Sequence, residues 1–123
     1  MAYPPRGRRA FEKLVDEAVD SLPDRFFAYL ENVVIAVEDR PDPELLEDLG
    51  AEDLLGVYLG VPLTERQAGG AYMPDQILLF RKPLLEVCGS FEELRTQIRI
   101  TVVHEVGHFF GLNEEEIVAI LGE

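Results

Sequence analysis

Five consecutive residues, His104-Glu105-Val106-Gly107-His108, combine side-chain types that could carry out zinc-dependent hydrolysis. On a helix, histidines four residues apart lie one turn apart on the same face, so both imidazoles can bind one zinc ion. Glu105 would lie about 100° around the helix from His104, which is a poor position for a ligand but a suitable one beside a zinc-bound water. The spacing therefore predicts His104 and His108 as zinc ligands, with Glu105 as general base and then general acid.

A catalytic zinc usually takes three protein ligands and one water, so a third ligand must come from elsewhere in the chain. Glu114 follows His108 by six residues, beyond Gly111, where a glycine lets the chain reverse. We predict Glu114 as the third ligand, with Glu115 or Glu116 as substitutes. The alternatives left open are two buried histidines that donate to carbonyls, a surface glutamate between them, and a row of carboxylates that the helix dipole alone stabilises.

A long helix must position these side chains. Ser90 can cap its N-terminus, and Glu93, three residues on, completes a capping box. Apolar residues at helical spacing continue to about Phe110, and Asn113 can then cap a short final helix. Gly107 is unfavourable inside a helix by about 1 kcal/mol relative to alanine. Its presence indicates a close approach of backbone or metal shell, or close packing against a sheet.

The remaining periodicities predict an α+β fold, in which a small sheet of about three strands packs on the long helix. Helices are expected at residues 8–21, 24–29 and 43–48, a short helical turn at 83–86, and strands at 33–37, 55–60 and 76–80. The length of 123 residues predicts a single domain, 1–123, whose residues 1–8 are expected to be a flexible tail.

Composition limits the classes of partner and compartment. The net charge of −13 argues against nucleic acid and anionic membranes as partners, because phosphates would be repelled. The apolar runs are too short to span a bilayer, and no apolar segment follows the charged N-terminus, so we expect no signal peptide. The single cysteine, Cys88, excludes a disulfide within the chain, fits a reducing cytoplasm and is expected to be a small buried hydrophobe. The oligomeric state is not predicted.

The frame HExxHxxGxxE resembles the zincin signature, with Glu114 where the longer metzincin signature has a third histidine. It differs from metzincins in that no methionine follows the motif and only 15 residues follow His108. From about Phe11 onwards, the chain more closely resembles the short bacterial minimal zincin family of metallopeptidases. The blocks that carry this resemblance are Val37-Glu38-Asp39 with Pro41, Gly60-Val61-Pro62-Leu63-Thr64-Glu65-Arg66, Pro74-Asp75-Gln76-Ile77-Leu78-Leu79-Phe80 and His104 through Glu114.

The resemblance implies a reduced zincin core of mixed sheet, active-site helix and last short helix, with Zn2+ as cofactor and a peptide or protein as substrate. In zincins an edge strand beside the active-site helix holds the substrate backbone extended, and Ile77–Phe80 is our candidate for that strand. Tyr58 or Tyr72 could polarise a carbonyl near zinc, although packing is the default role of tyrosine. Two alternative functions remain: a non-catalytic zinc-containing binding module that retains a zincin core, and a protease that needs a partner chain.

Overall fold

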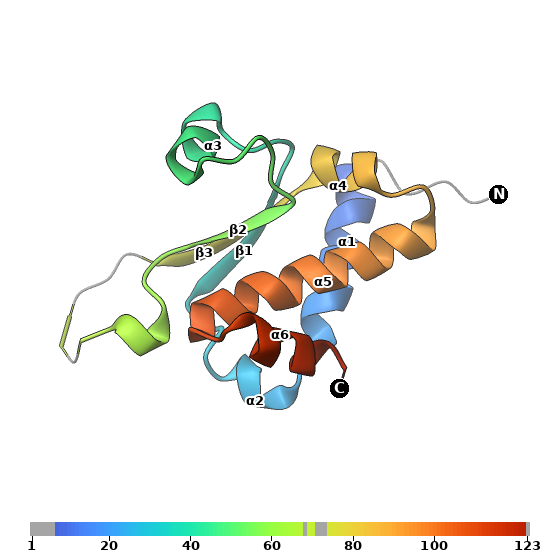
Figure 1. Ribbon diagram of the computed structural model, residues 1–123. Coiled ribbons are helices and arrows are strands. Elements are labelled where there is room, and N and C mark those ends of the chain that lie inside the picture. The colour runs from blue at the N-terminus through green and yellow to red at the C-terminus, as the bar shows by residue number, and fades with distance from the viewer. Residues whose placement is uncertain (1–6, 68, 71–73, 123) are drawn as a thin grey trace.

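The computed structural model describes residues 7–67, 69–70 and 74–122. Helices and a small sheet follow one another along the chain, with the long helix running beneath the sheet (Figure 1). In chain order the elements are α1 (Arg8–Asp20), α2 (Asp24–Phe27), β1 (Val33–Glu38), α3 (Pro43–Leu49), β2 (Gly56–Leu59), the 3-10 turn η1 (Leu63–Glu65), β3 (Asp75–Phe80), α4 (Arg81–Val87), α5 (Phe91–Phe110) and α6 (Glu114–Leu121). The α+β class expected from the sequence is therefore confirmed.

The three strands lie in the order β1-β3-β2, with β1 parallel and β2 antiparallel to β3. The sheet is therefore mixed, as the family resemblance implies. Ile77–Phe80 belongs to β3, which pairs with Ile35–Glu38 on one side and with Gly56–Tyr58 on the other. The prediction of an edge strand there is wrong. The apolar runs of β1 and β3 are equally continuous, so composition does not distinguish the outer strand from the central one, and strand order follows from pairing over long separations.

α1 packs against α5, and α5 packs against β2 and β3, with the buried core between them (Figure 1). The second half of α5 lies against β2 at Thr101 and against α6 at Gly107, and it is buried around much of its circumference. His104 and His108 form its partly exposed polar stripe, with side chains 35% and 40% exposed. The fully buried side chains of this core include Phe11 of α1, Ile77 and Leu79 of β3, Leu84 of α4, and Leu94, Ile98 and Val102 of α5.

The ends of α5 and α6 follow the capping residues that the sequence indicates. Ser90 accepts a hydrogen bond from the backbone N–H of Glu93, although the Glu93 carboxylate accepts from Gly89 N–H rather than from Ser90. Asn113 and Glu116 form a complete capping box at the start of α6. These local contacts fix where both helices begin, and therefore where the motif lies on the surface of α5.

Four other expectations concern the N-terminal tail, the number of domains, Cys88 and membrane-spanning helices. Residues 1–6 of the expected tail lie outside the described residues, and α1 begins at Arg8, which pairs with Glu12. Single-domain organisation stays a prediction. Cys88 packs half-buried against the core, and burial raises the pKa of its thiol, to which the nearby Glu93 adds. Among the residues that the structure describes, every helix is too short or too polar to cross a bilayer.

Candidate metal centre

α5 presents the two histidines side by side, with ring centroids 4.3 Å apart. The buried carboxylate of Glu105 lies beneath them and contacts both rings. Its Oε2 is 2.9 Å from Nδ1 of His104 and its Oε1 is 3.2 Å from Nδ1 of His108. An ionised carboxylate only accepts hydrogen bonds, so it favours the tautomer in which each Nδ1 carries the proton. Both Nε2 lone pairs then remain available for a metal ion.

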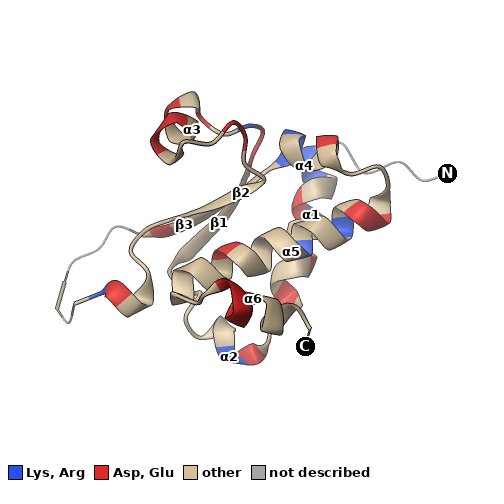
Figure 2. Ribbon diagram, viewed as in Figure 1, with Lys and Arg blue, Asp and Glu red and all other residues tan. Residues whose placement is uncertain are grey.

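Glu114 approaches the same two rings from α6, whose acidic first turn is red in Figure 2. Its Oε1 lies 3.1 Å from Nε2 of His104 and 3.8 Å from Nε2 of His108. A tetrahedral zinc ion with bonds of about 2.0–2.1 Å separates its ligand atoms by about 3.4 Å, and these two distances bracket that value. With both Nδ1 atoms protonated, three acceptor atoms converge, which is unfavourable unless a cation or a proton lies among them. The donor set therefore fits zinc.

The two carboxylates beside His104 also affect the pKa of its imidazole. Burial lowers the pKa of this imidazole, but the hydrogen bond and negative charge of Glu105, reinforced by Glu114, outweigh burial and hold the pKa above its usual value of 6.5. The surroundings thus favour a positive charge at the ring.

The connection from α5 to α6 determines which glutamate reaches the histidines. Gly111 has a φ of 75°, the left-handed conformation that glycine favours, and Leu112 N–H donates to Gly107 O at 2.9 Å. The chain therefore reverses directly after α5, as the sequence predicts. Glu116 is engaged in the capping box, where it accepts from Asn113 N–H, and the carboxylate beside the histidine rings belongs to Glu114.

Gly107 explains how α6 comes so close. A Cβ atom at this position would lie 2.4 Å from Cγ1 and 2.7 Å from Cδ1 of Ile117, which is buried in α6. The close approach expected from the sequence is therefore real, but its partner is α6 and not the sheet. Because Glu114 is three residues before Ile117, this contact brings the acidic first turn within reach of the histidines.

Gly107→Ala is expected to lower stability and zinc affinity together. The gain in helix propensity of about 1 kcal/mol is opposed by overpacking of about 1–3 kcal/mol, because Ile117 is β-branched and has little room to move. Urea unfolding of the metal-free protein and a zinc competition titration measure the two effects. Gly89→Ala is the matched control, since a Cβ there would lie an ordinary 3.6 Å from Glu93. A Gly107→Ala protein equal to its parent in both measurements would show that α6 is not held by this contact.

An edge strand lies directly beside the helix that bears the motif. A Cβ atom at Gly56 of β2 would lie 2.6 Å from Cγ2 of Thr101, one turn before His104. Tyr58, also on β2, donates its hydroxyl hydrogen to Asp75 at 2.6 Å, and burial together with this bond raises its pKa to about 12. The phenol is therefore held by Asp75, in keeping with the packing role. Tyr72 lies outside the described residues.

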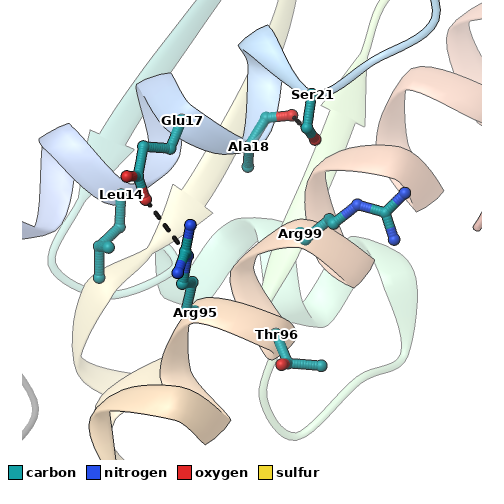
Figure 3. A pocket seen from close by; sticks show the side chains of 7 residues that line it. All are labelled: Leu14, Glu17, Ala18, Ser21, Arg95, Thr96 and Arg99. Atoms are coloured by element: carbon teal, nitrogen blue, oxygen red, sulfur yellow. Dashed lines mark hydrogen bonds and ion pairs between the residues drawn. The ribbon is translucent and has the colours of Figure 1, made fainter.

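A pocket lies elsewhere, between α1 and the first half of α5 (Figure 3). It has a volume of about 360 Å³, and its Arg95 forms an ion pair with Glu17 at 3.4 Å. Arg95 precedes His104 by nine residues, which places it about 180° around the helix. The pocket is therefore on the opposite side of α5 from the motif. The ligand atoms of His104, Glu105 and His108 lie within 4.8 Å of one another, and the exposed Glu114 adds a carboxylate oxygen 3.1 Å from Nε2 of His104.

Residue-by-residue reasoning from the sequence missed three side chains near the site, namely Thr64, Arg66 and Asp75. Asp75 is buried at the start of β3, and Arg66 pairs with it from the loop after β2. Thr64 lies against Gly111, where a Cβ atom would be 2.2 Å from its Oγ1. All three belong to the blocks on which the family resemblance was based, but their types and spacing offered no chemical reason to single them out.

Comparisons with known proteins agree with the motif. A family model described as zincin-like metallopeptidase matches residues 30–122. No curated protein matches the chain. Among solved structures, a conserved hypothetical protein from T. thermophilus is similar, with 27% identity and a TM-score of 0.58, over 92% of this chain and 98% of that one. The two chains therefore share their fold over almost their whole lengths.

Proposed function

Since the chain belongs to the zincin-like metallopeptidase family, we propose that it is a zinc-dependent hydrolase that cleaves peptide bonds. The observation that carries this proposal is the position of Oε1 of Glu114, 3.1 Å from Nε2 of His104 and 3.8 Å from Nε2 of His108, while the buried carboxylate of Glu105 contacts Nδ1 of both rings. A purely structural zinc site is closed by four protein ligands and needs no base beside it. Three ligands and a nearby carboxylate favour catalysis.

In this proposal His104, His108 and Glu114 hold the ion. When bound, zinc supplies a Lewis acid for the substrate carbonyl and lowers the pKa of a bound water to about 7. The Glu105 carboxylate, through its contacts with both Nδ1 atoms, keeps the two imidazoles in the orientation and tautomer needed for binding. The side chains that surround the second half of α5 hold this helix, and so the ligand spacing, rigid.

Glu105 also moves the proton. Its Oε1 contacts His108 at 3.2 Å and its Oε2 contacts His104 at 2.9 Å, and in this proposal Oε1 exchanges its contact for one with the attacking water. Oε1 then accepts the water proton and donates it to the leaving amine nitrogen as the peptide bond breaks. Catalytic hydrogen bonds commonly tighten only when substrate is bound.

Because Ile77–Phe80 is paired with a strand on both sides, we assign the binding of an extended substrate to β2 instead. This strand is an outer strand of the sheet, and its Gly56 touches Thr101 on the helix that carries the motif. An extended peptide could pair with its outer edge through main-chain hydrogen bonds, which give affinity with little demand on sequence. Such pairing suits a peptide or protein substrate. The net charge of −13 would disfavour nucleic acid on the same surface.

Zinc content tests the ligand set. The parent is expected to contain about one zinc per chain by elemental analysis, whereas Glu114→Ala retains much less, because a site with two protein ligands is incomplete. Glu115→Ala is the matched control, since it removes the neighbouring carboxylate from the same exposed first turn and is expected to retain zinc. A Glu114→Ala protein with full zinc would remove Glu114 from the ligand set. A parent that neither contains zinc nor takes it up would contradict the proposed function.

A further inference from the structure

A buried carboxylate outside the metal centre is held by two side chains from the β2–η1 segment. Asp75 is 4% exposed at the start of β3. Its Oδ1 accepts the hydroxyl hydrogen of Tyr58, and its Oδ2 is paired with the guanidinium of Arg66. Gly60 passes so close that a Cβ atom there would lie 2.2 Å from Oδ1 of Asp75. Removing a charge from water is unfavourable, so a carboxylate in this position must be compensated by the contacts that it organises.

Arg66 connects Asp75 to the loop that follows β2. Its Nε donates to the carbonyl oxygen of Val61 at 2.7 Å, which closes the segment around the η1 turn. Its guanidinium also lies 5.6 Å from the ring centroid of Phe109, and the Tyr58 ring lies 5.8 Å from the same ring. Phe109 directly follows His108 on α5. The network thus ties the loop both to β3 and to the helix that carries the motif.

The η1 turn in turn contacts the connection that leads to Glu114. Thr64 fills the space next to Gly111, where a Cβ atom would lie 2.2 Å from its Oγ1 and 2.7 Å from its Cγ2. Gly111 is the left-handed residue at which the chain reverses, and Glu114 lies three residues beyond it. The side chain of Glu114 is 73% exposed, so little packing of its own fixes its place. The position of the turn therefore depends on what packs against it.

We propose that Asp75 is a positioning residue for the third zinc ligand: through Arg66 and the η1 turn, it holds Gly111 where Glu114 faces the two histidines. This inference rests on the proposed function, in that it takes Glu114 as a ligand of zinc. Asp75 itself touches neither the metal nor the substrate.

Zinc dissociation constants, measured by competition with a chromogenic chelator, test the inference. Asp75→Asn keeps the shape of the side chain and removes the charge that holds Arg66. We expect it to weaken zinc binding about tenfold, the lower end of the range for residues that orient metal ligands. Asp39→Asn is the matched control, because Asp39 pairs with Arg81 at the opposite end of the sheet, and its zinc binding is expected to equal that of the parent.

The decisive comparison repeats Asp75→Asn in a Glu114→Ala protein. If Asp75 acts through Glu114, the substitution causes no further loss of zinc affinity in that background. A general loosening of the fold would instead weaken zinc binding about equally in both backgrounds, and this result would overturn the inference. In the metal-free protein, the Leu112 amide is expected to exchange its hydrogen faster in Asp75→Asn than in the parent, because its bond to Gly107 O belongs to the same turn.

Thr64→Ala provides the test if Asp75→Asn does not fold. It removes the atoms that touch Gly111 and leaves the buried carboxylate in place. Zinc binding about threefold weaker than in the parent, again only when Glu114 is present, would support the inference, and unchanged binding would overturn it. A parent that binds zinc while these variants bind it equally well refutes this inference alone. A parent that binds no zinc refutes the proposed function and, with it, the inference.

Discussion

Glu105→Gln is expected to lower peptidase turnover by about 10²–10⁴-fold, the usual contribution of a general base, when turnover is measured at zinc concentrations that fill the site. Glutamine has the shape of glutamate, but its amide cannot accept a proton from water and pass it to the leaving nitrogen. The measurement is kcat on a peptide substrate identified with the parent, together with zinc content. Glu92→Gln is the matched control, because Glu92 lies on the same helix, in its exposed first turn, and its variant is expected to retain full activity.

The outcome also separates two roles of Glu105. The carboxylate contacts Nδ1 of both histidines, so it orients them in addition to any proton transfer. If orientation were its whole role, Glu105→Gln would weaken zinc binding, yet each zinc-loaded molecule would turn over as fast as the parent. If the Glu105→Gln variant is as active as the parent with zinc fully bound, Glu105 is not the general base. A zinc-loaded parent that cleaves no peptide, alone or with a partner chain, would favour the binding-module alternative.

His104→Ala and His108→Ala are each expected to abolish zinc-dependent stabilisation. A ligand that binds the folded state alone stabilises it by about 2.7 kcal/mol at a hundredfold excess over its dissociation constant. The parent should therefore gain several degrees in Tm when zinc is added, and the two variants should gain none. Melting curves with and without zinc measure the effect.

The same curves in the presence of a chelator supply the control. Both histidine side chains are more than a third exposed on their buried helix, so metal-free variants are expected to melt close to the metal-free parent. Equal metal-free melting combined with the lost zinc response assigns the effect to ligation. Variants that keep the full zinc response would refute the assigned ligands, and variants that melt far below the metal-free parent would show a structural role.

The sequence by itself determined the features that depend on neighbours three to six residues away. The i, i+4 spacing of the histidines, the caps at Ser90 and Asn113, and the glycine at 111 are local relations, and helices form from local hydrogen bonds. For this reason the bounds of α5 and α6 and the common face of the two histidines agree with the sequence. The strand ranges also agree to within about two residues, since alternation and β-branching are local signals.

Tertiary structure decided which strand lies at an edge, which residue of α6 explains Gly107, and what surrounds the turn before Glu114. Strand order follows from pairing over long separations, so an apolar run such as Ile77–Phe80 gives no indication of a neighbour on one side or on both. The contact of Gly107 with Ile117 and the pairing of Asp75 with Arg66 depend on how separate elements meet. Local sequence names the residue types at a metal centre, whereas packing between distant segments sets the distances between them.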